Sequence, residues 1–209
     1  MDTAKLQFKP LSPTRRNAVK TRERLLNAAY EEVYRTGFQG SDLMSIIKRA
    51  GVTKGALYHH FGSKEGLGLA MIDAVIAPKI ADTWLNPLAE AEDPVAALIK
   101  IIEGQPSGED DIKGGSPLNN LALEMSPLDE NFRVRLARIY NSWIAAIAAA
   151  LKRGKATGKV RADVDVFEFA TGLVASFEGF VTLAKSAQDS ALLSVGIRQM
   201  KQTLQGLRP

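Results

Sequence analysis

The chain has 209 residues, of which 45% are hydrophobic and none is cysteine, and its formal net charge is +4. The lack of cysteine excludes disulfides, thiolate metal sites and thiol redox sensing. This length allows one sizeable core beside a small second lobe.

Other patterns limit the place of the chain in the cell and its metal chemistry. No apolar run reaches the roughly 18 to 20 residues that cross a bilayer, and the amino end lacks the apolar stretch of a secretory signal, so we expect a cytoplasmic protein without membrane contact. The only histidines, His59 and His60, are adjacent and have no acidic partner at metal-ligand spacing. We therefore expect no metal and no cofactor.

Positive charge is concentrated at the amino end. Residues 1–64 contain 12 Lys and Arg against 5 Asp and Glu, a balance of +7, which leaves the rest of the chain near −3. Such asymmetry indicates a polyanion bound at this end. Residues 1–17 are expected to form a basic flexible arm, which either lies in a DNA minor groove or is simply solvated.

Residues 18–64 are predicted to form three short helices. Helical periodicity runs through Leu43, Ile46 and Ala50 and stops at Gly51, a residue suited to the left-handed corner that ends a helix. Thr53 is placed as the N-cap of the next helix. This second short helix is predicted to expose a hydroxyl, an ammonium, rings and a glycine, as suits a DNA major groove. The alternative is an ordinary helical hairpin with a solvated face. The exposed residues are Thr53, Lys54, Gly55, Tyr58 and His59.

These residues closely resemble the DNA-binding domain of TetR-family repressors. The resemblance rests on Thr21-Arg22, Ala28-Ala29, Gly37-Phe38, Ser41, the run from Ala50 to Phe61, and Ser63-Lys64-Glu65. It covers about the first third of the chain. Two residues depart from the family pattern: Ile47 replaces the usual alanine between the short helices, and Met44 replaces a polar phosphate contact. The DNA contacts that we expect are Ser41, Met44, Thr53, Lys54, Gly55, Tyr58, His59 and Lys64.

The remainder, residues 65–209, is predicted to be an all-α body for ligand binding and dimerisation. A helix from Ser63 should kink or restart at Pro78, and Asp93-Pro94 should open another. Residues 104–115 are glycine-rich and acidic and are predicted to be a disordered loop. The helices expected after it cover about 118–125, 129–153, 165–185 and 189–207.

The last two predicted helices carry small residues and an apolar seam. In TetR-like proteins these helices usually build a four-helix dimer bundle, which implies a homodimer here. An intrachain core face fits the pattern equally well. The interface residues expected from the resemblance are Gly172, Ser176, Gly179, Leu193 and Ile197.

The middle of the body is the predicted ligand cavity, although aromatic residues at helical spacing are more often plain core. Glu178 is the most informative of these residues, because a buried carboxylate in an apolar helix needs a partner. The segment 115–127 is similar to one branch of the family, whose members often have cysteine where Ser116 stands; a chain without it must bind its effector reversibly. The expected cavity residues are Trp84, Asn119, Leu121, Met125, Tyr140, Trp143, Phe177 and Glu178.

The sequence thus predicts a homodimeric repressor of double-stranded DNA, released from its operator by a small, largely apolar effector. A ligand-independent or activating regulator is the alternative, and a small-molecule carrier that has lost DNA binding is a weaker one. An enzyme is not expected, because no nucleophile triad, phosphate-binding glycine loop or paired carboxylate is present.

Overall fold

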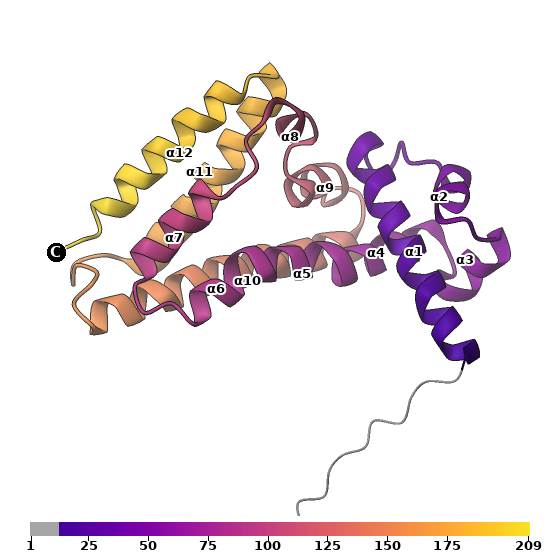
Figure 1. Ribbon diagram of the computed structural model, residues 1–209, viewed down its shortest axis with the longest axis horizontal. Helices are drawn as coiled ribbons and strands as arrows, with labels where there is room; N and C mark the ends of the chain where they lie inside the picture. Colours follow the sequence, from indigo (N-terminus) through magenta and orange to yellow (C-terminus); the bar gives the residue numbers. More distant parts are fainter. Residues whose placement is uncertain (1–12) are drawn as a thin grey trace, which may run out of the picture.

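The computed structural model describes residues 13–209, and in that range only helices and their connections occur. A small head, formed by α1 (Pro13–Thr36), α2 (Leu43–Ala50) and α3 (Lys54–Phe61), stands at one end of a larger helical body (Figure 1). The predicted all-α fold is therefore confirmed. Most of the expected basic arm lies outside the described residues, but its last part is already helical, since α1 begins at Pro13.

The head is held together by a small apolar core of its own. Leu25, Ile46 and Leu57, one from each helix, are fully buried there. Ile47 is also buried, at 5% exposure, so the space between the two short helices accepts the larger side chain. A core of this kind fixes α3 relative to α1 and leaves its outer face free.

A continuous helical rod joins the head to the body. It consists of α4 (Lys64–Met71), the π-helix η1 (Ile72–Ile76), α5 (Ala77–Ile80), the π-helix η2 (Ala81–Leu85) and α6 (Asn86–Ala89). Where a kink or restart at Pro78 was predicted, a π-helix gives way to α5 one residue before the proline, and the chain stays helical. A wider π turn precedes both Pro78 and Pro87, and such a turn accommodates a ring that would clash with an α-helical carbonyl. The helix consequently passes both prolines without a break.

Six further helices complete the body. The long α10 (Glu130–Ala156) runs beside the rod and packs on α7 (Pro94–Glu103), α9 (Pro117–Met125) and α11 (Val166–Ala187), while α12 (Ser190–Gln205) covers α11 and α7 (Figure 1). The sixth is the short α8 (Glu109–Gly114).

The segment 104–115 is not the disordered loop that its composition predicted, because α8 occupies its second half. The Asp111 carboxylate accepts the Gly108 N–H at 3.1 Å and so caps the helix. Ile112 is 4% exposed and packs with Ala184 and Leu193. One apolar anchor is therefore enough to order an otherwise polar segment.

Helix α11 is unusually apolar for its degree of burial. It is the one described helix that is long and apolar enough, by length and composition, to cross a membrane, with a mean hydropathy of 1.4, and core helices of soluble proteins can have the same composition. It packs between α10 and α12, yet only 28% of its most apolar window is buried. Much apolar surface on α11 is thus left uncovered by its own chain.

Candidate nucleic-acid interface and body cavity

The helix-turn-helix corner is fixed by three local devices. The Asp42 carboxylate caps α2 by accepting the Ser45 N–H at 2.8 Å, and the Thr53 hydroxyl caps α3 by accepting the Ala56 N–H at 3.2 Å. Between them Gly51 has the left-handed conformation, with φ 59°. Arg24 of α1 donates to the Gly51 carbonyl at 3.0 Å, which ties the corner to the first helix.

The outer face of α3 is exposed as predicted. Thr53, Lys54, Gly55, Tyr58 and His59 are all exposed, and the Lys54 ammonium lies 5.8 Å from the centre of the Tyr58 ring. A Cβ on Gly55 would meet nothing closer than the Thr53 hydroxyl at 3.9 Å. No packing within the described chain explains this glycine, so it suits the close approach of another molecule's backbone.

The adjacent histidines have different surroundings. His59 is exposed on the reading face, whereas His60 is half-buried and its ring centre lies 6.0 Å from that of Phe61. Burial, with the neighbouring His59 and Arg22, lowers the pKa of His60 below its usual value. His60 is therefore a neutral packing residue at neutral pH.

Two of the expected DNA contacts are committed to the head itself. Ser41 is 6% exposed and its hydroxyl donates to the Phe38 carbonyl at 2.7 Å, so it is not presented to a phosphate. The Lys64 ammonium donates to the Ser41 carbonyl at 2.7 Å and lies over the Phe38 ring. Lys64 therefore fastens α4 to the turn before α2, and neither side chain is free to contact DNA in this conformation. Met44, by contrast, is 57% exposed.

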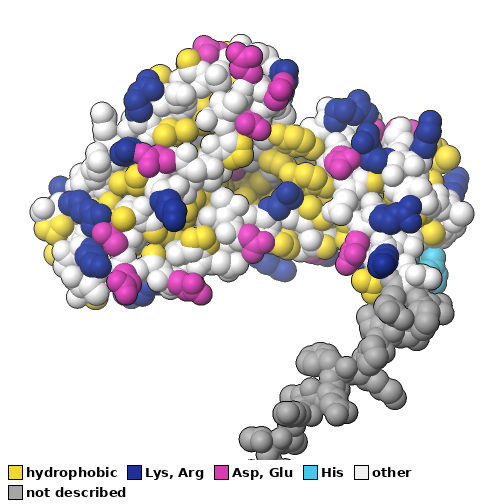
Figure 2. Space-filling model, in the orientation of Figure 1, with side chains coloured by type: hydrophobic (Ala, Val, Ile, Leu, Met, Phe, Trp, Pro, Cys, Tyr) yellow, Lys and Arg dark blue, Asp and Glu magenta, His cyan; other side chains and the backbone are white. Residues whose placement is uncertain are grey.

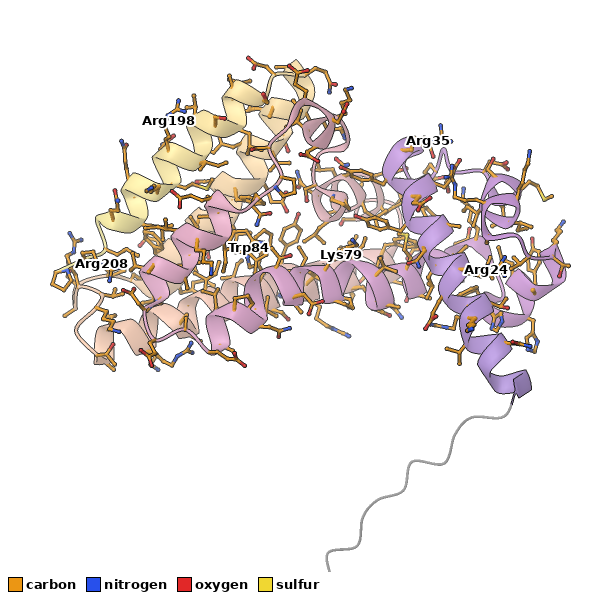
Figure 3. The ribbon with its side chains drawn as sticks, in the orientation of Figure 1. Arg24, Arg35, Lys79, Trp84, Arg198 and Arg208 are labelled. Atoms are coloured by element: carbon orange, nitrogen blue, oxygen red, sulfur yellow. The ribbon has the colours of Figure 1, made fainter. Side chains whose placement is uncertain are left out.

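A cavity of about 380 Å³ opens between the head and the body. Figure 2 shows hydrophobic side chains gathered in a hollow between these two parts. Four of the predicted residues line the cavity: Trp84, Trp143, Phe177 and Glu178. Trp84 projects from the rod toward the centre of the body (Figure 3), with its ring centre 4.7 Å from that of Trp143 and 5.1 Å from that of Phe177.

Two polar atoms in this cavity wall have no hydrogen-bond partner in the described part of the chain. They are Nε1 of Trp143 and Oε2 of Glu178, whose residues are 1% and 6% exposed. The other oxygen, Oε1 of Glu178, accepts the Ser116 hydroxyl at 3.0 Å. Burial raises the pKa of Glu178 to about 7, although the Ser116 hydrogen bond acts in the opposite direction. Such unsatisfied groups are characteristic of a ligand site.

The other four predicted cavity residues lie elsewhere. Leu121 and Met125 are 2% and 3% exposed on the inner face of α9 and belong to the core. Asn119 and Tyr140 are joined by a hydrogen bond of 3.3 Å and line an open groove beside α11, to which Glu178 also contributes. Periodicity identified the inner stripe of each helix but not which part of that stripe borders a void.

Sequence reasoning missed the contribution of the head to the cavity. Tyr30 and Tyr34 of α1 form part of the cavity wall, with ring centres 6.0 Å apart, and the Tyr34 hydroxyl donates to the Gly115 carbonyl at 3.0 Å. Lys79 of the rod is a further wall residue, with its ammonium 5.0 Å from the Tyr30 ring centre. The signal available in the sequence was the spacing of Tyr30 and Tyr34, which places two aromatic rings one helical turn apart on the same face of α1.

A second contact between head and body was also missed. The Glu124 carboxylate of α9 accepts the Phe38 N–H at 2.8 Å and the Gln39 N–H at 2.7 Å. These are free backbone donors in the turn that leads to α2. Since Ser116 caps the same helix by accepting the Asn119 N–H at 3.2 Å, α9 connects the Glu178 site to the head.

The expected interface residues divide into two groups. Gly172, Ser176 and Gly179 lie on the exposed face of α11, and a Cβ on either glycine would have no neighbour within 4 Å. Leu193 is only 2% exposed and packs on Ile112 and Ala184 of its own chain, so its assignment to a subunit seam is wrong. Ile197 is half-buried against the same cluster.

Comparison with known proteins places both parts of the chain. Residues 25–71 match the family model described as bacterial regulatory proteins, tetR family, and residues 80–200 match that of the tetracyclin repressor-like C-terminal domain. The transcriptional regulator LmrA of Bacillus subtilis is 31% identical over 178 residues, which cover 83% of this chain and 90% of that protein.

Two further similarities extend over most of the chain. The transcriptional repressor DhaR of Mycobacterium sp. (strain GP1) is 28% identical over 171 residues, covering 78% of this chain and 82% of that protein. A TetR transcriptional regulator from Chloroflexus aurantiacus has a crystal structure that superimposes with a TM-score of 0.79 at 27% identity, over 91% and 96% of the two chains. The chain belongs to the TetR family of DNA-binding transcriptional regulators.

Proposed function

We propose that this regulator is a cytoplasmic homodimeric repressor, released from its operator by a small, largely apolar effector that occupies the cavity between head and body. The observation that carries the proposal is the makeup of that cavity, which combines aromatic walls, two unpartnered buried polar atoms and side chains from both the head and the body. The repressor names of relatives such as DhaR support the direction of regulation.

The exposed face of α3 would read the operator. Lys54 and Tyr58 can reach phosphates and base edges, while Gly55 lets the helix backbone approach the groove. One such helix contacts only a few base pairs. A two-fold dimer would read two half-sites separated by about 34 Å, one turn of DNA.

The exposed face of α11 would form the dimer interface. Apart from Glu168, its residues are small or apolar, and broad grooves of about 580 and 760 Å³ flank it, one beside α12 and one beside α9 and α10. Phe167 and Leu183, at 65% and 55% exposure, extend the face at its two ends. Uncovered apolar area of this kind suits a second copy of the chain.

Coupling would run through the two contacts that join head and body. An effector between Tyr34 and the rings of Trp84, Trp143 and Phe177 would contact α1 directly. It would also contact α9, whose Glu124 accepts a hydrogen bond from the turn before α2. An effector that favours a misplaced head weakens operator affinity by its differential binding free energy, typically about 1 to 3 kcal/mol.

The proposal is tested in two steps. Selection from a random double-stranded DNA library should yield a two-fold symmetric operator with half-sites one turn apart. A thermal-shift screen of apolar metabolites should then find compounds that raise the melting temperature and release this operator in gel shifts. Compounds that stabilise the protein without changing operator affinity would instead indicate a ligand-independent regulator.

A further inference from the structure

The carboxylate of Glu178 lacks a compensating charge. Within the described residues it forms no ion pair, and its only hydrogen-bond partner is the Ser116 hydroxyl. The residue is nevertheless 94% buried, since its exposure is 6%. Burial of an ionised carboxylate is strongly unfavourable unless a cation or several donors reach it. Glu178 borders the cavity, so a cationic ligand bound there can supply the missing charge.

The walls around this carboxylate suit a cation with an apolar body. The rings of Trp84, Trp143 and Phe177 lie against one another, with centres 4.7 to 5.8 Å apart. Aromatic faces attract organic ammonium groups, most strongly where water is excluded. The unpartnered Nε1 of Trp143 adds a donor that requires an acceptor oxygen elsewhere on the ligand.

The charged side chains that line the cavity also favour a cationic ligand. Its lining contains three carboxylates, Asp110, Asp111 and Glu178, against a single ammonium, that of Lys79. Lys79 lies over the Tyr30 ring, and Asp110 is paired with Lys113, which is not among the lining residues. Carboxylates therefore outnumber ammonium groups around the cavity, with Asp110 and Asp111 exposed at its rim, and such an excess favours a ligand of positive charge.

We propose that the effector is a small organic amine, bound as its cation, with the ammonium on Oε2 of Glu178, the apolar body against the Trp84, Trp143 and Phe177 rings, and an acceptor oxygen on Nε1 of Trp143. This inference rests on the proposed function only in assigning the cavity to the effector. The cavity volume of about 380 Å³ suits a molecule with one ring and a short chain.

The protonation of Glu178 makes this assignment testable by pH. Burial raises the pKa of Glu178 to about 7, so the empty site is partly protonated near neutral pH. An ammonium ion favours the ionised form, so amine binding releases a proton from this site. The other titratable side chains that border Glu178 or line its cavity are Tyr30, Tyr34, Lys79, Asp110, Asp111 and Tyr140.

The test uses three probes that differ only in their polar end: phenoxypropylamine, phenoxypropanol and phenoxypropanoate. Each contains a ring, an ether oxygen as acceptor, and a three-carbon chain. Binding to the full-length protein and to Glu178→Gln is measured by calorimetry at pH 8 and pH 6. Glu130→Gln, the same change at an exposed residue of α10, is the matched control.

The amine is expected to bind the wild type at least about tenfold more tightly than the alcohol, as for a charge-assisted hydrogen bond, and the carboxylate more weakly still. Its affinity should fall at pH 6. In Glu178→Gln the preference for the amine should disappear, while Glu130→Gln should retain it. Equal or tighter binding of the alcohol or carboxylate by the wild type, a preference that survives in Glu178→Gln, or no binding of the amine would overturn the assignment. Release of the operator by a neutral compound would then leave the proposed repressor function standing.

Discussion

Two residues, Glu178 and Gly55, lower the stability of the folded chain when nothing is bound to it. The first is a buried carboxylate without an ion pair, and the second is a glycine in an exposed helix with no close neighbour. Local rules of stability are commonly broken where a protein binds something. These two departures lie in the cavity and on the reading face, and each leads to a prediction in which stability and binding change in opposite directions.

The Glu178→Gln variant should stabilise the free protein at high pH. The folded-state pKa of Glu178, about 7, lies above its ordinary value of 4.5, so the folded chain binds the proton more tightly than the unfolded chain. The free energy of unfolding therefore falls as pH rises from about 4.5 to about 7, by up to about 3 kcal/mol. The variant, which cannot ionise, should be more stable by about that amount at pH 8 and by little at pH 4.5.

Urea denaturation of both proteins across this pH range measures the difference. Glu90→Gln serves as the control, because Glu90 is exposed and forms no ion pair among the described residues. A Glu178→Gln variant that is less stable than the wild type at pH 8 would contradict the buried, uncompensated carboxylate.

The Gly55→Ala variant should raise stability and lower operator affinity. Alanine stabilises a helix by about 1 kcal/mol relative to glycine, and here its methyl group meets open space. The same methyl group would lie between α3 and the groove. Melting curves and gel shifts separate the two effects, and Ser142→Ala, an exposed change in α10, should leave operator affinity unchanged. A variant with normal operator affinity would move the reading face away from Gly55.

Lys54 and Lys64 of the head should contribute differently to operator binding and to stability. Lys54→Ala should weaken operator binding and reduce its salt dependence without lowering stability, because Lys54 is exposed at the start of α3. Lys64→Ala should also lower the melting temperature, because it removes the bond to the Ser41 carbonyl. Gel shifts at several salt concentrations, with the exposed body residue Lys152→Ala as control, test both. Equal salt slopes for Lys54→Ala and wild type would contradict the phosphate contact.

The residue scale also shows the limit of sequence reasoning. Helical periodicity was enough to identify the exposed side chains of α3 because neighbouring core positions fix its orientation. It did not predict that Ser41 and Lys64 each form a hydrogen bond to a backbone carbonyl three or more residues away. Polarity alone does not distinguish a side chain that faces DNA from one that satisfies its own backbone.

Among the helices, prediction succeeded where the apolar pattern is long. The predicted helix start at Asp93-Pro94 and the predicted range 129–153 lie close to the observed bounds of α7 and α10, which Asp93 and Asp129 cap. Prediction did not anticipate the π turns that precede the two prolines of the rod. It also missed α8, whose order depends on contacts of Ile112 with α11 and α12. Neither a widened turn nor a long-range contact is visible in local composition.

Helix α9 has the most consequential position, because it connects the cavity to the turn before α2. Glu124→Gln can accept only one of the two N–H groups that Glu124 now holds, at Phe38 and Gln39. We expect a loss of about 1 to 2 kcal/mol in stability, faster hydrogen exchange at Phe38 and Gln39, and a weaker effect of the effector on operator affinity.

Glu109→Gln, an exposed change at the start of α8, is the control for this variant. Unchanged exchange at Phe38 and Gln39 would contradict the clamp. Unchanged effector response with faster exchange would assign the coupling to α1 alone, through Tyr30 and Tyr34.

At the scale of the whole molecule, the sequence indicated the body side of the cavity but not the side that the head contributes. Its body residues lie on helix stripes that the sequence reveals, but Tyr30 and Tyr34 come from α1, which the sequence assigns to the head. Their role depends on how the head docks on the body, and this placement follows from the straight rod and the Glu124 contact. The same docking makes the cavity a place where a bound molecule bears on both parts.

The exposed face of α11 leads to the last prediction. Gly172 and Gly179 are exposed, and a Cβ at either position would meet no neighbour within 4 Å in the single chain, so a side chain there can extend into solvent. Across a close helix contact the same side chain would separate the two copies and bury a charge. We expect Gly172→Arg and Gly179→Arg to be folded monomers with lost operator affinity, because a single head reads only one half-site. Sedimentation velocity and gel shifts measure both properties, with Asn86→Arg on α6 as a matched exposed control. Circular dichroism checks that both variants are folded, and dimers of normal operator affinity in both would place the interface on another face.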